Sequence, residues 1–287
     1  MASPPLTRRR FLGRAAAAAP FAGVLFGGTA AAYGTLLEPR WVDWTLHRVP
    51  VAGLPEHLNG FRVVHLTDIH ASSVVPMSFV RSVVDEINED PPDAVVVTGD
   101  LLTAESHWAP RIADELGRLR PKRGTFAILG NHDYWCDGPR VSRELDRVGV
   151  HHLRNASVVL DGLRLVGIDD HWTGNDDLDR AMAGVGAAEP TLLAMHSPDL
   201  VVQAAGAGID VALAGHTHGG QVRIPGWGAL IVPSERGYQM GWYEHGGTRL
   251  YVNRGLGTLE LKVRLACRPE VAEFVLEPGP DLPARRP

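Results

Sequence analysis

The sequence predicts an α/β fold in which parallel strands are covered by helices on both faces. Short, continuous runs of Val, Ile and Leu, which are typical of strands buried on both faces, alternate with stretches whose apolar residues recur at helical spacing. The chain of 287 residues, of which 45% are hydrophobic, is also long and apolar enough to bury a large core. Strand and helix patterns in alternation are typical of a parallel sheet.

The first half of the chain contains three strand–helix units. We expect strands over residues 61–67, 94–98 and 125–129. The apolar residues at helical spacing fall within residues 79–87, 112–119 and 139–148. Pro121 ends the second helix, and Gly149 caps the third, which begins near Pro139.

In the second half the strands become shorter and hairpin signals appear. Asp161-Gly162 is a strong turn signal between two strand patterns. We expect strands over residues 157–160, 163–168, 191–195, 211–214, 250–252 and 271–276. No linker divides the chain, so we expect one domain over residues 33–278 and a polar, proline-rich tail over residues 279–287.

The N-terminal residues 1–32 predict an export segment. Four arginines precede an apolar, alanine-rich run over residues 15–32; they are Arg8, Arg9, Arg10 and Arg14. Their arrangement resembles a twin-arginine signal, and Ala30-Ala31-Ala32 offers a cleavage site. An uncleaved anchor helix, interrupted at Pro20, is the alternative. Either way we expect the domain outside the cytoplasm, in the periplasm or on the outer face of the membrane or cell wall. The expected partners are the twin-arginine translocation machinery and the membrane.

Charge and cysteine content exclude several classes of protein. The formal net charge is −5, so a nucleic-acid scaffold role is excluded. Two cysteines, Cys136 and Cys267, are too few for a disulfide scaffold or a zinc ribbon, and we expect them to be separate buried residues. Any metal site must therefore be built from carboxylates and from the 13 histidines.

Polar side chains with metal-binding chemistry follow five of the expected strands. Asp68, Asp100 and Asn131 are 32 and 31 residues apart, about one strand–helix–strand unit. His196 and His216 follow two further strands. Because ligands bind beyond the carboxyl ends of the strands in an open α/β sheet, we expect these five side chains to meet at one edge.

The motifs around these residues resemble those of the calcineurin-like metallophosphoesterase superfamily over residues 61–219, and less specifically to Val275. They are Asp68-Ile69-His70, Gly99-Asp100, Gly130-Asn131-His132-Asp133, His196-Ser197-Pro198 and Gly215-His216-Thr217-His218-Gly219-Gly220-Gln221. The last motif, with Asn253-Arg254-Gly255-Leu256-Gly257, resembles the exported or membrane-associated bacterial phosphodiesterases of that superfamily. The resemblance implies a four-layer αββα sandwich with mixed sheets, in which the strands after Asp161 build the second sheet.

The resemblance also implies a binuclear metal centre that hydrolyses phosphoesters. Asp68, His70 and His218 would hold one cation, Asn131, His196 and His216 the other, and Asp100 both. Such ligands suit Mn, Fe or Zn. Two cations would activate a bridging hydroxide for attack on phosphorus. The implied function is a phosphodiesterase acting outside the cytoplasm on an envelope or extracellular phosphoester.

The resemblance extends less directly to four further residues. His132 would stabilise the transition state or protonate the leaving oxygen. Asp133 would orient His132, although it is equally well explained as a helix cap. Arg254 would contact the substrate phosphate or, alternatively, pair with a carboxylate. His171 is a weaker substrate-binding candidate in a segment, residues 169–188, that matches no known substrate.

Two other functions remain open. A pyrophosphatase of the UDP-2,3-diacylglucosamine type in lipid A biosynthesis is one, and the predicted export argues against it because the nucleotide donor is cytosolic. A metal-binding envelope protein without catalysis is the other, and the presence of His132 argues against it.

Overall fold

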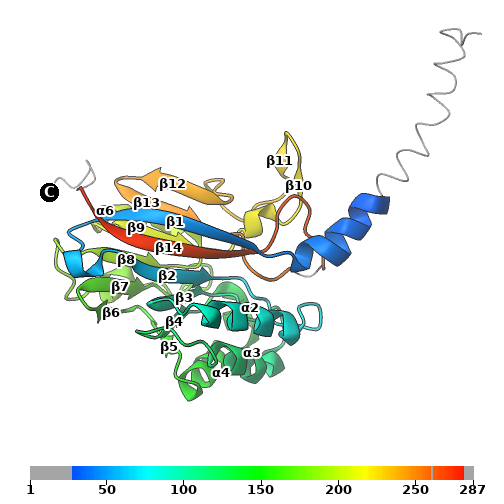
Figure 1. Ribbon diagram of the computed structural model, residues 1–287, viewed down its shortest axis with the longest axis horizontal. Coiled ribbons are helices and arrows are strands. Elements are labelled where there is room, and N and C mark those ends of the chain that lie inside the picture. Colours follow the sequence, from blue (N-terminus) through cyan, green and yellow to red (C-terminus); the bar gives the residue numbers. More distant parts are fainter. Residues whose placement is uncertain (1–27, 260, 281–287) are drawn as a thin grey trace, which may run out of the picture.

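The computed structural model describes residues 28–259 and 261–280 (Figure 1). Two six-stranded sheets pack face to face, and helices cover both outer faces. Both sheets contain parallel and antiparallel strand pairs. The predicted four-layer αββα sandwich with mixed sheets is therefore confirmed.

The first sheet carries the three predicted strand–helix units. Its strand order is β1 (Asp43–Ala52), β14 (Glu270–Gly279), β2 (Phe61–Leu66), β3 (Ala94–Thr98), β4 (Thr125–Ile128) and β5 (His151–His152). Strands β2 to β5 are parallel, whereas β14 runs antiparallel to β2. Its outer face is covered by helices α2 (Met77–Glu89), α3 (Ala109–Leu116) and α4 (Asn131–Arg147).

The second sheet is built mainly from the second half of the chain. Its order is β12 (Gly241–His245), β13 (Thr248–Val252), β9 (Val211–Ala214), β8 (Thr191–Ala194), β7 (Leu163–Gly167) and β6 (Ala156–Leu160). The short helices α5 (Leu178–Ala181) and α6 (Val201–Gly206) cover it. A separate hairpin, β10 (Arg223–Ile224) and β11 (Gly228–Ala229), projects from one end of the molecule (Figure 1).

The sheet assignment of two predicted strands needs a correction. We expected every strand after Asp161 in the second sheet, but β14 inserts between β1 and β2 of the first sheet, and β6, before Asp161, joins the second. Local residue patterns identify a strand but not its neighbour, since pairing depends on contacts far along the chain. Strand β1, which pairs with β14 over its whole length, has no counterpart in the sequence analysis.

Alternation along the strands divides the core into three layers. In β3, Val95 and Val97 pack against the helices, whereas Val96 packs between the two sheets. In β8, Leu192 lies between the sheets and Leu193 faces the short helices. Successive side chains of a strand point to opposite faces, so strands buried on both sides must be apolar at every position. Each such side chain contributes about 1.5–3 kcal/mol through burial.

Helix α4 begins earlier than predicted. We placed its start near Pro139, but it begins at Asn131, and Asp137 interrupts it with an extended backbone. The Asp137 carboxylate accepts a hydrogen bond from the Arg140 N–H at 3.1 Å, which is the capping arrangement of a new helix start. The prediction thus located the second half of α4 and missed the first half, which carries the polar residues after β4.

The N-terminal prediction falls largely outside the described residues, which begin at Gly28. Residues 28–32 are helical and continue into a π-helical turn at Tyr33–Leu37. Within the described chain, no helix is both long enough and apolar enough to cross a membrane. Cys136 and Cys267 are both free; Cys267 is buried, as predicted, whereas Cys136 is only partly buried.

Candidate metal centre

The predicted metal ligands converge at the carboxyl ends of the strands. Six of them form two buried groups, in each of which one ligand atom per residue lies within 4.8 Å of the others. The groups are Asp68, His70 and His218, and Asp100, His196 and His216. Asn131 lies beside Asp100 of the second group, because a Cβ at the preceding Gly130 would overlap the Asp100 carboxylate and the backbone N–H of the following His132 donates to that carboxylate at 2.9 Å.

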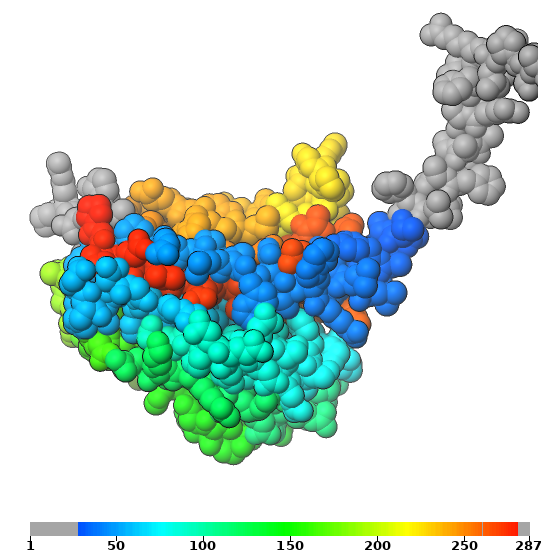
Figure 2. Space-filling view, in the orientation of Figure 1, coloured from blue at the N-terminus to red at the C-terminus, as the bar shows by residue number. Residues whose placement is uncertain are grey.

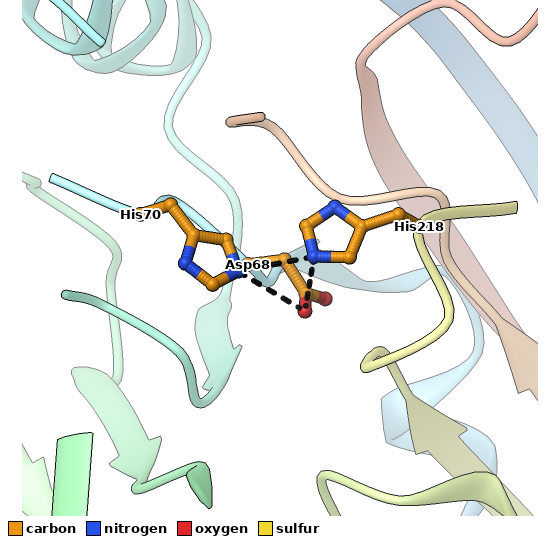
Figure 3. Close-up of side chains that lie close together, drawn as sticks. All are labelled: Asp68, His70 and His218. Carbon is orange, nitrogen blue, oxygen red and sulfur yellow. Dashed lines mark hydrogen bonds and ion pairs between the residues drawn. The ribbon is translucent and has the colours of Figure 1, made fainter. Parts of the chain in front are cut away.

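The first group brings together residues 150 positions apart. The Nε2 atoms of His70 and His218 are 3.0 Å apart. Asp68 Oδ1 lies 3.3 Å from the Nε2 of His218 and 4.0 Å from that of His70. Figure 3 shows the two imidazoles approaching the carboxylate from opposite sides. Three donor atoms therefore point toward one small region, as metal ligands do.

Asp100 connects this group to the second. Its Oδ2 lies 3.5 Å from His70 Nε2 and 3.2 Å from His196 Nε2. His216 Nδ1 lies 3.2 Å from the same His196 nitrogen. The Nδ1–H of His196 donates to the Thr98 carbonyl at 2.7 Å, which leaves Nε2 with its lone pair facing the site.

Five residues of the two groups have a left-handed backbone. The φ angles lie between 49° and 69° at Asp68, His70, Asp100, His216 and His218. Such angles are uncommon outside glycine, and they cluster at functional sites where the surrounding structure enforces them. The turns after the strands thus aim the side chains inward, at a cost in backbone strain.

Two glycines allow the strand ends to approach closely. A Cβ at Gly130 would lie 2.8 Å from His196 Cε1 and would overlap the Asp100 carboxylate. A Cβ at Gly215 would overlap the Asp68 carboxylate. Both motif glycines are therefore required for space at the centre.

Burial keeps most of the imidazoles neutral. It lowers the pKa of His70 to about 4 and that of His216 to about 3, and the neutral form binds metals. Burial also raises the pKa of Asp68 to about 6. Burial alone would lower the pKa of His196, but the adjacent Asp100 carboxylate outweighs it and raises the pKa to about 10. The two carboxylates thus favour positive charge at the site.

The donor set fits two divalent cations. In the described chain, Asp68 and Asp100 pair with histidines and form no ion pair with Lys or Arg. The buried Oδ1 of Asn131 has no hydrogen-bond partner among the described residues, as expected of a ligand atom. Carboxylate, amide and imidazole donors together suit borderline metals such as Mn, Fe or Zn.

His132 lies beside the first group, but Asp133 does not orient it. The His132 ring packs edge-on against His70, with ring centroids 5.0 Å apart. Its Nδ1–H donates to the Thr103 carbonyl at 2.6 Å. The Asp133 carboxylate instead accepts hydrogen bonds from the N–H groups of Gly130 and Leu102, each at 3.0 Å. The helix-cap alternative for Asp133 is therefore the correct one.

The structure does not bring the two substrate-binding candidates into the site. Arg254 pairs with Glu270 at 3.0 Å and with Asp43 at 2.8 Å, so its guanidinium is held by carboxylates, as the alternative proposed. His171 lies at the surface and pairs with Asp176 at 2.9 Å. The sequence analysis named no specific carboxylate partner for Arg254 or His171. Asp43 and Asp176 lie in segments for which it predicted no element.

Two exposed tryptophans lie against the site instead. The Trp172 ring is 4.7 Å from that of His216, and the Trp135 ring is 4.9 Å from that of His132. The sequence analysis did not select either one, because aromatic residues near turns are more often packing residues. The feature of the sequence that could have identified Trp172 is its position just after Asp169 and Asp170. These two aspartates follow β7 in the same way that the candidate metal ligands follow their own strands.

Comparisons with known proteins identify the family. Residues 61–220 match the calcineurin-like phosphoesterase family. The uncharacterized metallophosphoesterase YkuE of Bacillus subtilis (strain 168) is 32% identical over 95% of this chain and 98% of its own length. Phosphodiesterase YaeI of Escherichia coli (strain K12) is 32% identical over 94% of this chain and 99% of its own. From these matches, the chain belongs to the calcineurin-like phosphoesterase family and is a metallophosphoesterase, a hydrolase that uses two divalent metal ions.

Proposed function

We propose that the protein is a phosphodiesterase that acts outside the cytoplasm on an envelope or extracellular phosphodiester. The observation that carries the catalytic part is the position of Asp100 where the two groups meet: its carboxylate lies 3.2 Å from His196 of its own group and 3.5 Å from His70 of the other. The preference for a diester is supported by the Escherichia coli relative, whose name is phosphodiesterase.

The residues of the centre divide the work of hydrolysis. Two bound divalent cations supply an activated water and stabilise charge on the phosphoryl oxygens. Asp68, His70 and His218 would hold one cation and Asn131, His196 and His216 the other, with Asp100 shared. His132 would act beyond them: the Thr103 carbonyl accepts a hydrogen bond from its Nδ1–H, so in the imidazolium form the Nε2–H would supply the proton to the leaving oxygen, and a neutral imidazole would remain.

This role of His132 predicts a dependence on the leaving group. With manganese added, the wild-type protein should hydrolyse both bis(p-nitrophenyl) phosphate and the alkyl diester glycerophosphoglycerol. His132→Ala should lower kcat on the alkyl diester by about 10²–10⁴-fold, because an alkoxide needs a proton to leave. The loss on the p-nitrophenyl diester should be much smaller, since p-nitrophenolate leaves unprotonated.

The controls separate catalysis from binding of the metals. Bound metal, measured by elemental analysis, should be unchanged in His132→Ala, and the exposed His107→Ala should match the wild type. Equal losses on both diesters would contradict proton donation by His132. Hydrolysis of monoesters alone would contradict the phosphodiesterase proposal.

The proposed location rests on residues 1–32 and has its own test. Replacing the arginine pair, Arg8→Lys with Arg9→Lys, should leave a C-terminally tagged protein in the cytoplasm, because the twin-arginine route reads that pair. Arg14→Lys, outside the pair, should be exported like the wild type in cell fractionation. Equal export of all three proteins would refute the twin-arginine assignment.

A further inference from the structure

An unusually apolar surface surrounds the β10–β11 hairpin. It consists of five exposed side chains, which we call the apolar rim: Ile224, Trp227, Leu230, Ile231 and Leu261. Trp227 is 88% exposed and Ile231 80%. Soluble proteins rarely expose large apolar side chains in contiguous groups, and those that do use them to bind a partner or a membrane.

A groove runs from this rim to His218 of the first metal group. Its volume is about 300 Å³, and Ile231, Pro233, Leu259 and Leu261 line it together with His218 of the first metal group. The Gln221 side chain ties one wall in place: its amide accepts from the Leu259 N–H at 2.8 Å and donates to the Leu261 carbonyl at 3.2 Å. An apolar lining therefore extends from the rim to a residue of the first metal group.

The N-terminal helix leaves the domain at the same end. The Arg264 N–H donates to the Gly34 carbonyl at 2.8 Å, and the adjacent Leu265 carbonyl accepts from the Arg223 N–H at 2.9 Å, at the start of β10. Leu36, Leu37 and Trp41 add further exposed apolar side chains there. Figure 2 shows the hairpin, in yellow, and the N-terminal helix, in blue, projecting from the same end of the molecule.

The sequence that enters at this end indicates what covers the rim. From Ala15 to Leu37 the chain contains no charged residue, and the first charged residue after this stretch is Glu38. An uncharged stretch of this length is compatible with hydrocarbon. This uncharged stretch joins the domain beside the apolar rim. A bilayer that held the stretch would therefore face both the rim and the opening of the groove.

We infer that the apolar rim rests on a phospholipid bilayer and that the groove receives an acyl chain of a phosphodiester lipid held in that bilayer. This inference rests on the proposed phosphodiesterase function and adds the substrate class. Apolar side chains at a membrane surface bind in proportion to the area they bury, and Trp227 at the hairpin tip is the kind of side chain that favours the interface.

Kinetics on two substrates with the same leaving group test the inference. The rim variant combines Trp227→Ser, Ile231→Ser and Leu261→Ser in the full chain. The control variant combines Val159→Ser and Val202→Ser, which are exposed apolar residues of β6 and α6. The substrates are soluble bis(p-nitrophenyl) phosphate and the p-nitrophenyl ester of phosphatidic acid, carried in vesicles of phosphatidylcholine and phosphatidylglycerol.

The expected result is a loss of hydrolysis that is confined to the vesicle substrate. The rim variant should hydrolyse the vesicle substrate about tenfold or more slowly than the wild type and the control, with the soluble diester unaffected. Because all three proteins carry the same N-terminal segment, its contribution cancels. An equal vesicle rate in all three overturns the inference, as does wild-type activity on the soluble diester alone. If even the soluble diester is not hydrolysed, the proposed function fails instead.

A binding measurement that does not depend on turnover completes the test. Vesicles of brominated phosphatidylcholine quench tryptophans that reach the acyl region. Subtracting the fluorescence of Trp227→Phe from that of the wild type gives the emission of Trp227 alone. The vesicles should strongly quench this emission. An unquenched difference places Trp227 in water and refutes the membrane contact, and it would redirect the search to a protein partner for the rim.

Discussion

Asp100→Asn should weaken the binding of both metal ions and lower phosphodiester turnover by more than about 100-fold, beyond the 10–100-fold typical of an outer-shell change. The amide keeps the size of the side chain and the oxygen that accepts the His132 N–H at 2.9 Å. It removes the negative charge next to His70 and His196 and replaces one donor oxygen with an N–H₂ group. Since the Asp100 carboxylate lies within 3.5 Å of a histidine of each group, its loss should affect both cations.

The measurements separate loss of metal from loss of fold. Elemental analysis should find both cations reduced in Asp100→Asn. Added manganese should raise the wild-type Tm, because a ligand that binds only the folded state stabilises it, and it should not raise that of the variant. Asp93→Asn is the matched control, since Asp93 precedes β3 and Asp100 follows it. An Asp100→Asn protein with full metal content and full activity would remove the basis of the binuclear centre.

Arg264→Met should lower the free energy of unfolding by about 2–4 kcal/mol. Arg264 is fully buried, and in the described chain its guanidinium forms no ion pair. It donates instead to four backbone carbonyls, at 3.0 Å to Gly257, 3.2 Å to Cys267 and 2.9 Å to both Arg254 and Gly255. Methionine fills much of the space but leaves these carbonyls without a donor.

The substitution of Arg264 should affect the metal centre as well. The segment held by Arg264 supports the Asp68 turn, because the Gly257 N–H donates to the Asp68 carbonyl at 2.8 Å. We therefore expect weaker metal binding in addition to the lower stability. The free energy of unfolding of Arg264→Lys should lie between that of Arg264→Met and that of the wild type, because an ammonium supplies donors but not the guanidinium geometry. Denaturant unfolding measures the change, with the exposed Arg120→Met as control. Stability equal to the wild type would show that other donors replace Arg264.

The candidate ligands were predictable because each one follows a strand with a clear local pattern. The strands before Asp68, Asp100 and His216 are short apolar runs, and parallel strands bring their carboxyl ends to one edge. The spacing of these residues along the chain therefore predicted that their side chains lie close together in the fold. The same reasoning could not assign partners across the fold, so Arg254 was linked to substrate although it pairs with Asp43 and Glu270.

Backbone partners were equally invisible in the sequence. His132 is held by the Thr103 carbonyl, and any residue at position 103 offers a carbonyl. Arg264 lies in a segment without helical or strand pattern, where an arginine is normally a surface residue. Its guanidinium is held by three carbonyls of the turn around Gly257 and by the Cys267 carbonyl. Only the folded chain shows that these two side chains have their specific partners.

The sequence by itself determined most of the strand–helix order, the αββα class through the resemblance of its motifs, and the candidate ligands that gather in two buried groups. The strand–helix order follows from periodicity and the candidate ligands from residue type at the strand ends, which are local properties of the chain, whereas the αββα class follows from the resemblance of the motifs to a known family. Only the tertiary structure decided that β14 lies in the first sheet, that Asp133 caps a helix, and that the apolar rim and the groove meet beside His218. Strand pairing, backbone hydrogen bonds and surface contiguity depend on segments distant along the chain, and no local pattern encodes them.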